Sequence, residues 1–367
     1  MSFLRPLSKP SLVPVGTSGT QHQDPVLPSP HVRIGTLTLE LTHRCHRRCA
    51  FCYIWDLARP EDPSPELSTE DIVRAARLMI EGTGCTNLQL SGGEPLLRAD
   101  LLPIVEGLND GARVSIITDA AHLDESLARA LAARRVRSIQ PTLLSGTDEV
   151  HDALRGRGAF RSVTRAIAVA SAVGLEVSVC MVITRKNYQE ASRVAELAFG
   201  LGARGLALSR FTPAGAAVRA FDALMPSSDE VRGACEAAVA TCRALGLPVA
   251  SAVTIPACVF DNPEVPVLRT GVCSLVGPRG TVTMGPDGSI RSCCLSGGSA
   301  GNVLEDPWGE IARRLESGHF QPMRAVPAVC SACPQLSRCL GGCRLSALAV
   351  FGDGDHPDPL CPHALCE

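Results

Sequence analysis

The sequence at positions 45–52 is Cys45-His46-Arg47-Arg48-Cys49-Ala50-Phe51-Cys52. It directly follows residues 34–41, Ile-Gly-Thr-Leu-Thr-Leu-Glu-Leu, an apolar run that predicts a β-strand. Three thiolates on one tight loop can hold three corners of a [4Fe–4S] cube, which needs four ligands. The fourth iron would then be open to bind another molecule. A structural zinc site is the alternative, although it would need a fourth ligand.

The composition argues against several classes of function. The net charge of −2 provides no basic field for nucleic acid, and an aromatic content of 4% offers few platforms for stacking bases. No apolar run approaches the roughly 20 residues of a membrane span, and residues 1–30 lack the apolar core of a signal peptide. We therefore expect a cytoplasmic protein that binds neither nucleic acid nor membrane.

The 17 cysteines are unevenly placed along the 367 residues. Three lie between 45 and 52, and nine lie between 273 and 366. Without an export signal, metal or cluster ligation is favoured over disulfides. The tail beyond residue 329 is dense in Cys, Gly and Pro, which predicts a segment whose fold is held by metal. A zinc ribbon is the alternative for this tail, because Cys-x2-Cys pairs often bind zinc.

Strands and helices are predicted to alternate through the first half of the chain. The strands are expected at 34–41, 87–90, 113–118, 136–143, 176–184 and 205–211, with helices in between. Such alternation gives a parallel sheet with right-handed crossovers. Six units suit an α/β fold of the TIM-like type, an open partial (β/α)6 barrel whose site lies at the carboxyl ends of the strands. Beyond residue 213 we expect a helix at 228–244, an apolar stretch at 248–255 and a β-hairpin at 280–292.

A second motif, Ser91-Gly92-Gly93-Glu94-Pro95, follows the second predicted strand. Together with Cys45-x3-Cys49-x2-Cys52 it resembles the radical S-adenosyl-L-methionine (SAM) superfamily, over about residues 34–215. The resemblance implies that the open iron binds the amino and carboxylate groups of SAM. The glycines would let the backbone approach a ligand closely, and Glu94 would hold the ammonium group. Tyr53 would lie near the adenine. The cofactor-binding residues implied in this way are Tyr53, Ser91, Gly92, Gly93, Glu94, Thr118, Thr142 and Arg210.

The chain departs from the family pattern at two places. Thr118-Asp119-Ala120 stands where Thr-Asn-Gly is frequent, and Leu144-Ser145 stands where one Asp is common. These departures concern contacts to SAM or substrate and leave the cluster loop unaffected.

The tail resembles the SPASM pattern, an extension that holds auxiliary iron–sulfur clusters. Seven cysteines match it: Cys273 and Cys293 around Gly288, then Cys330-x2-Cys333-x5-Cys339-x3-Cys343, and finally Cys361. The resemblance implies one auxiliary cluster on Cys273, Cys293 and Cys343, and another on Cys330, Cys333, Cys339 and Cys361. The first set needs a fourth ligand. Cys258 is favoured for this role, and Cys294 or an open iron is the alternative. The cofactors expected are SAM and three [4Fe–4S] clusters, one radical SAM cluster and two auxiliary ones.

These resemblances lead to a division of the chain. We expect a flexible extension at 1–33, a radical SAM partial barrel at 34–225, a bridging helix and strand at 226–257, and a small α+β SPASM domain at 258–367. The extension is expected to be too short for a built-in leader-binding domain.

The function implied is that of a radical SAM/SPASM maturase. A 5′-deoxyadenosyl radical would take a hydrogen atom from a ribosomally made precursor peptide, and a cross-link or another oxidative change would result. A separate leader-peptide recognition protein and an electron donor such as flavodoxin or ferredoxin would be partners. The sequence indicates no catalytic side chain beyond the Cys45, Cys49 and Cys52 loop. A radical pathway does not need a dedicated general base, so this is compatible with catalysis.

Three other functions are considered. A dehydrogenase or epimerase of a sugar or aminocyclitol would share the same cofactors. Sulfatase maturases have a similar cluster layout, but they typically place an acidic residue after an auxiliary cysteine, where this chain has Cys294. An iron–sulfur electron carrier would not need Gly92, Gly93 and Glu94.

Overall fold

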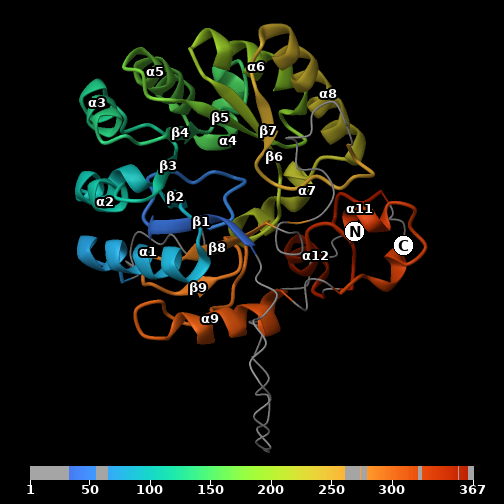
Figure 1. The fold of residues 1–367 in the computed structure, drawn as a ribbon. Coiled ribbons are helices and arrows are strands. Elements are labelled where there is room, and N and C mark those ends of the chain that lie inside the picture. Colours follow the sequence, from blue (N-terminus) through green and yellow to red (C-terminus); the bar gives the residue numbers. More distant parts are fainter. Residues whose placement is uncertain are drawn as a thin grey trace, which may run out of the picture. The chain divides into compact units, whose positions relative to one another are not determined.

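The computed structural model describes residues 33–54, 65–260, 273, 279–320, 325–353 and 355–362 (Figure 1). The predicted extension lies outside the described residues except for Arg33, which already belongs to the first strand. Helices that are long and apolar enough to cross a membrane are absent from the described part of the chain.

The six predicted strands are confirmed, and neighbouring strands run parallel. They are β1 (Arg33–Thr42), β2 (Asn87–Gly92), β3 (Arg113–Thr118), β4 (Ser138–Pro141), β5 (Ser178–Ile183) and β6 (Gly205–Arg210). One sheet has the order β4-β3-β2-β1, and another pairs β5 with β6 and then β7 (Val249–Ser251). Two parallel bridges, between Ile139 and Val177 and between Thr142 and Cys180, join β4 to β5. The strands therefore follow one another in chain order, as a partial barrel requires.

Helices connect the strands and cover the outer face of the sheet (Figure 1). They are α1 (Thr69–Thr83), α2 (Leu101–Leu108), α3 (Glu125–Ala133), α4 (Asp148–Arg155), α5 (Ala159–Ala172) and α6 (Ala191–Gly200), and short 3₁₀ turns lie at Pro95–Leu97 and Tyr188–Glu190. Helix α4 was not predicted. Its eight residues are too few to show a clear helical period, and it ends at Gly156, which has a φ of 99°.

Helix α1 shows how the local sequence determines where a helix begins, where it ends and which face it buries. Ser68 is its N-cap, and the Ser68 hydroxyl accepts a hydrogen bond from the backbone N–H of Asp71 at 3.1 Å. The helix ends at Gly84, whose φ of 70° is the left-handed conformation that glycine adopts without cost. Ile72, Met79 and the alanines between them are buried at helical spacing, so this face packs on the sheet.

Strand β1 is buried on both faces. Leu37, Leu39 and Leu41 point to one side and are at most 1% exposed. Glu40 and Thr42 alternate with them and are equally buried, at 1% and 0%. Because successive side chains of a strand point to opposite faces, β1 presents a leucine face to the apolar core and a polar face on its other side. The alternation of residues along β1 therefore gives the sheet a polar face opposite the apolar core.

The C-terminal part of the chain joins the same sheet. Strand β8 (Arg279–Met284) pairs in parallel with β1, and β9 (Ile290–Arg291) pairs antiparallel with β8, which confirms the predicted hairpin. Pairing with β1 was not predicted, because it joins residues about 245 positions apart in the sequence. The barrel and the cysteine-rich tail therefore share one sheet rather than forming two separate ones.

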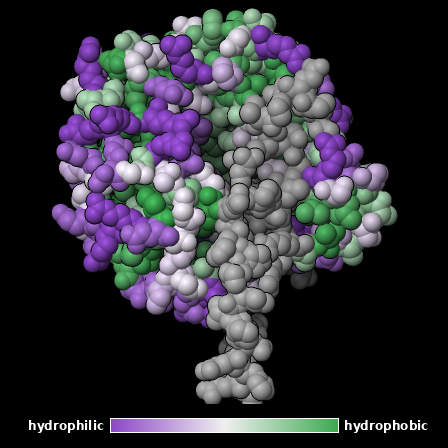
Figure 2. Space-filling view, in the orientation of Figure 1, coloured by the Kyte–Doolittle hydropathy of each residue, from purple (hydrophilic) through white to green (hydrophobic). Residues whose placement is uncertain are grey.

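The remaining elements lie beyond β6. They are a 3₁₀ turn at Gly215–Ala220, α7 (Phe221–Leu224), α8 (Ser228–Leu245), α9 (Trp308–Arg314), a π-helical turn at Leu315–Phe320, a 3₁₀ turn at Ala328–Cys330, α11 (Leu336–Cys339) and α12 (Arg344–Phe351). Helix α8 begins with a capping box between Ser227 and Glu230. In the view of Figure 2, hydrophilic residues gather over the side on which α1, α2 and α3 lie.

A buried ion pair joins β6 to the tail. Arg210 and Asp358 have side chains that are 0% and 1% exposed, and their charged groups are in direct contact. Arg210 also donates hydrogen bonds to the carbonyl oxygens of Thr254, at 3.0 Å, and Phe211, at 3.4 Å. All three guanidinium nitrogens therefore bind protein acceptors. Arg210, which was expected among the SAM-binding residues, therefore has the geometry of an anchor between the barrel and the tail.

We expect Arg210→Leu to lower the free energy of unfolding by about 3–5 kcal/mol, because it leaves Asp358 charged and unpaired in the interior. The matched control is Arg129→Leu, which breaks the Arg129–Glu125 pair of 2.6 Å on an exposed face, with side chains 66% and 63% exposed. That change should cost less than about 1 kcal/mol. Urea unfolding of the two variants measures the difference, and equal losses would contradict the assignment of Arg210 as an anchor.

Candidate active site at the carboxyl ends of the strands

The cysteine loop and the glycine motif meet at one end of the sheet. Residues 45–52 follow β1, and Gly93 and Glu94 follow β2, which pairs with β1 in parallel. The backbone N–H of Gly93 donates to the carbonyl oxygen of Thr42 at 2.7 Å, and that of Glu94 donates to Arg44 at 2.9 Å. Ser91, buried at 3%, stands opposite Glu40 in the register of the two strands. The two sequence motifs thus form one continuous structure.

The need for glycine in this motif has a specific cause. Gly92 has a φ of 118°, and a Cβ there would overlap the carbonyl oxygen of Thr42. A Cβ at Gly93 would overlap the carbonyl oxygen of Arg44. The close approach that the glycines allow is therefore to the backbone that leads into the cysteine loop.

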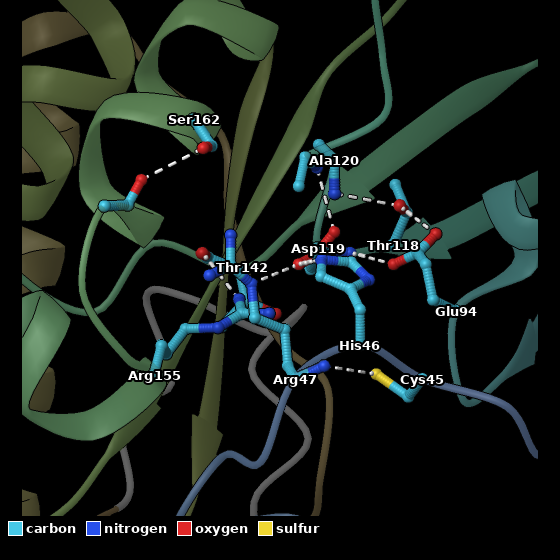
Figure 3. A network of polar contacts seen from close by, with 12 residues as sticks. Cys45, His46, Arg47, Glu94, Thr118, Asp119, Ala120, Thr142, Arg155 and Ser162 are labelled. Carbon is cyan, nitrogen blue, oxygen red and sulfur yellow. Dashed lines mark hydrogen bonds and ion pairs between the residues drawn. The ribbon is translucent and has the colours of Figure 1, made fainter. Parts of the chain in front are cut away.

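Glu94 places a buried carboxylate beside the cysteine loop. The residue is 0% exposed, and its carboxylate accepts hydrogen bonds from the Thr118 hydroxyl at 2.6 Å and from the backbone N–H groups of Leu96 and Asp119 at 2.9 and 2.7 Å (Figure 3). No Arg, Lys or His of the described residues forms an ion pair with it. Burial and the nearby Asp119 raise the pKa of Glu94 to about 8. A positively charged ligand group would restore the ionised form.

Asp119 ties the cysteine loop to the end of β3. Its Oδ2 accepts from Arg47 Nε at 2.7 Å and from His46 Nε2 at 3.0 Å, while its Oδ1 accepts from the backbone N–H of Ala121 at 2.8 Å (Figure 3). The backbone N–H of Arg47 in turn donates to the sulfur of Cys45 at 3.4 Å. In the sequence, Asp119 stood out only because it replaces the usual Asn. Its contacts with Arg47 and His46, which tie the cysteine loop to β3, were not predicted.

We expect Asp119→Asn to destabilise the protein by about 1–3 kcal/mol, because Arg47 and His46 lose a charged acceptor. The Cys45–Cys52 loop should also retain less iron, since it loses the ion pairs that hold it to the end of β3. Thermal unfolding and iron content measure the two effects. The control is Asp110→Asn, at an exposed position in the loop before β3. Iron content and stability equal to those of the control would speak against the role of Asp119.

Arg155 is a further residue at the site, and the sequence did not predict its role. It ends α4, is 7% exposed and donates to the carbonyl oxygen of Thr142 at 3.1 Å, just beyond β4. Its guanidinium also hydrogen-bonds Cys49, and its Nε is buried without a hydrogen-bond partner. Thr142, one of the predicted site residues, therefore takes part through its carbonyl oxygen, which holds Arg155. An unpaired buried donor beside the cysteine loop indicates room for a ligand acceptor.

Tyr53 points toward the tail cysteines. Its hydroxyl is hydrogen-bonded to Cys294, which also contacts Cys293. The loop is held on this side by a hydrogen bond from the backbone N–H of Ala217 to the carbonyl oxygen of Cys52 at 3.1 Å. The structure thus shows a contact of Tyr53 with the tail that was not predicted, and its expected position near the adenine stays a prediction.

The tail cysteines fall into distinct surroundings. Cys293 lies close to Cys294 and Cys273, whereas the sulfur of Cys343 accepts from the Ser346 hydroxyl at 3.3 Å. Five others line one cavity: Cys258, Cys330, Cys333, Cys339 and Cys361. Cys258, which was favoured as a ligand of the first set, thus lies in this cavity beside the second predicted set. Among the described residues, no three His, Cys, Asp or Glu side chains are arranged to hold a single metal ion.

Known proteins share this combination of fold and motifs. The profile described as the Radical SAM superfamily matches residues 39–198. A PqqA peptide cyclase from Streptomyces rochei is 30% identical over 343 residues, which cover 89% of this chain and 90% of that protein. The mycofactocin maturase MftC from Mycolicibacterium smegmatis is 28% identical over 346 residues, covering 89% and 82%. The chain belongs to the radical SAM superfamily, so SAM and an iron–sulfur cluster are its cofactors.

Solved structures share the fold at low sequence identity. Streptococcus suis SuiB bound to S-adenosylmethionine matches with a TM-score of 0.70 and 16% identity, over 90% of this chain and 78% of SuiB. The enzyme anSMEcpe with bound AdoMet matches with a TM-score of 0.63 and 17% identity, over 84% and 89%. Both likenesses extend beyond the barrel into the C-terminal part, which confirms the predicted fold class.

Proposed function

We propose that the protein is a radical SAM maturase that oxidatively modifies a ribosomally made precursor peptide. The observation that carries this function is the 30% identity to a PqqA peptide cyclase over nearly the full length of both chains. Similarity to a mycofactocin maturase supports the same class of substrate. The dehydrogenase, epimerase and electron-carrier alternatives have no such relative among the matches described above.

The site residues fit SAM and a cluster on grounds of charge and hydrogen bonding. Cys45, Cys49 and Cys52 provide three thiolates on one loop. Glu94 is a buried carboxylate without an ion-pair partner among the described side chains, which suits the ammonium group of SAM. The unpaired Nε of Arg155 is a donor for the carboxylate of SAM. When bound, the cluster and SAM supply the radical that removes a hydrogen atom from a C–H bond.

Two auxiliary clusters complete the proposed site. Cys273, Cys293 and Cys343 hold the first, and Cys294 becomes the candidate for its fourth ligand because it contacts Cys293. Cys330, Cys333, Cys339 and Cys361 hold the second, around the cavity that they line. The Tyr53–Cys294 hydrogen bond supports a position of the first auxiliary cluster next to the Cys45–Cys52 loop. The auxiliary clusters could accept the electron that remains after substrate oxidation.

The partners follow from this chemistry. The substrate is a precursor peptide, delivered by a separate leader-peptide recognition protein. Flavodoxin or ferredoxin supplies the electron that starts SAM cleavage. A cytoplasmic location suits both the reduced clusters and a newly synthesised peptide.

The experiment is anaerobic reconstitution with iron and sulfide, followed by incubation with SAM, dithionite and a candidate precursor peptide encoded near the gene. We expect about twelve iron atoms per chain, corresponding to three [4Fe–4S] clusters. We also expect 5′-deoxyadenosine and a peptide lighter by two hydrogen atoms, located by tandem mass spectrometry. Zinc in place of iron would refute the proposal. Formation of 5′-deoxyadenosine without any change in peptide mass would direct the search to another substrate.

A further inference from the structure

Arg344 is a buried arginine that forms no ion pair within the described part of the chain. It is 5% exposed, and its Nε is buried without a hydrogen-bond partner. The carboxylates of Asp353 and Asp355 act on it electrostatically, but both are exposed and bind elsewhere. Asp353 is hydrogen-bonded to His356 Nδ1 at 2.9 Å, and Asp355 accepts from the backbone N–H of Ala328 at 3.2 Å. Because a buried charge without a counter-charge is costly, an anion is expected beside this guanidinium.

The place of Arg344 in its helix strengthens this expectation. It is the first residue of α12, Cys343 is the N-cap, and the first turn contains no acidic residue. The N-terminal end of a helix carries a partial positive charge, so a cation is unfavourable there. The compensating negative charge must therefore come from outside α12.

The guanidinium lies at the edge of the cavity assigned to the second auxiliary cluster, whose proposed ligands are Cys330, Cys333, Cys339 and Cys361. Arg344 Nη1 donates to the carbonyl oxygen of His356 at 2.7 Å, and the next residue, Pro357, lines this cavity. Gly341 lines it as well, and a Cβ at Gly341 would lie only 3.3 Å from the same Nη1. The cation is thus held against two lining segments of a cavity in which four thiolates would gather.

We propose that Arg344 is the counter-charge of the second auxiliary cluster and raises the reduction potential of that cluster. The inference rests on the proposed function, which assigns a cluster to this cavity. Reduction adds one electron, and hence one negative charge, while no bond forms or breaks and no proton moves. The electron comes from the substrate radical in the proposed reaction and from dithionite in the test. A buried cation at the edge of the cavity stabilises the added charge, so the cluster accepts this electron more readily.

The test measures a reduction potential in a background that lacks the radical SAM cluster. With Cys45, Cys49 and Cys52 all replaced by alanine, the two auxiliary clusters should give about eight iron atoms per chain. Redox titration with dithionite is followed by electron paramagnetic resonance, and the signal of the second cluster is the one that a further Cys333→Ala removes. Arg344→Gln should lower the equilibrium constant for reducing this cluster by about tenfold, which is a shift of about 59 mV to more negative potential.

Two further variants separate charge from structure. Arg344→Lys keeps the positive charge but not the shape of the guanidinium, so its potential should stay close to that of the background protein. The matched control is Arg338→Gln, which removes an exposed arginine next to Cys339. Solvent and salt screen that charge, so the potential should not move. Circular dichroism and iron content establish that each variant is folded and loaded.

The possible failures are distinguishable. Absence of auxiliary iron in the background protein would refute the proposed function itself. Normal iron with an unchanged potential in Arg344→Gln would overturn the role of Arg344, as would an equal shift in Arg344→Gln and Arg344→Lys. Arg344→Met replaces the glutamine variant if that variant loses the second cluster. Loss in both uncharged variants with retention in Arg344→Lys would still show that the cluster needs the charge, whereas loss in all three would overturn the inference.

Discussion

Replacement of Cys45, Cys49 and Cys52 together by alanine is expected to abolish the reductive cleavage of SAM. The three thiols are the only cysteines on the loop that β1 delivers to the carboxyl ends of the strands, and the network of Asp119, Arg47 and Cys45 holds that loop in place. Without thiolates the loop has no ligand for iron, so 5′-deoxyadenosine should fall to the level formed without enzyme. The absorption of the auxiliary clusters should remain.

Chromatography of 5′-deoxyadenosine, together with the visible spectrum of the reconstituted protein, measures both parts of this result. The matched control is the pair Cys235→Ala and Cys242→Ala in α8. Both thiols are 0% exposed and belong to the buried core face of α8, outside the Cys45–Cys52 loop. The control should cleave SAM normally. Cleavage that survives in the triple variant would show that the radical starts elsewhere.

Glu94→Gln is expected to have the next largest effect, on the affinity for SAM. A charge-assisted hydrogen bond contributes about 1.5–3 kcal/mol, so its loss should weaken binding by about 10- to 150-fold. Glutamine keeps the size of the side chain and can still accept from Thr118 and Leu96, which limits the damage to the fold. Equilibrium dialysis with SAM measures the change, and the exposed Glu70→Gln in the first turn of α1 is the control.

The ratio of the two dissociation constants, Glu94→Gln over wild type, should depend on pH. The pKa of Glu94 is raised to about 8, so below that pH the wild type must release a proton before its carboxylate can pair with an ammonium group. The ratio should therefore rise with pH, by up to about tenfold per pH unit, and level off above about pH 8. Titration of SAM itself cancels in the ratio. A ratio that does not change between pH 6.5 and 9 would show that Glu94 does not pair with the ligand.

Local sequence was sufficient to predict much of the architecture. The predicted strand at 34–41, the helix that follows it and the hairpin at 280–292 all depend on neighbouring residues, and the structure confirms them. The cysteine loop and the glycine motif were placed correctly for the same reason. Each follows a parallel strand, and the carboxyl ends of parallel strands meet at one edge of the sheet.

Other roles depend on contacts between distant parts of the chain. Arg210 was expected at the cofactor, but the buried carboxylate that it pairs with lies 148 residues away at Asp358. Tyr53 was expected near the adenine, but its hydroxyl meets Cys294 from the tail. Cys258 was favoured as the fourth ligand of the first auxiliary cluster, but in the structure it lines one cavity with Cys361. No periodicity or spacing contains this information.

The sequence by itself determined that three thiols follow the first strand of a β/α repeat and that a glycine motif follows the second. Both depend on residue order over short distances, where chain geometry leaves few alternatives. The tertiary structure alone decided which charges and thiols surround them. Asp119, Arg155 and the pair of Glu40 with Arg291 acquire their partners only when β3, α4 and β9 are brought to the same end of the sheet as the Cys45–Cys52 loop. The cost of burying an unpaired charge or polar group then selects the partner.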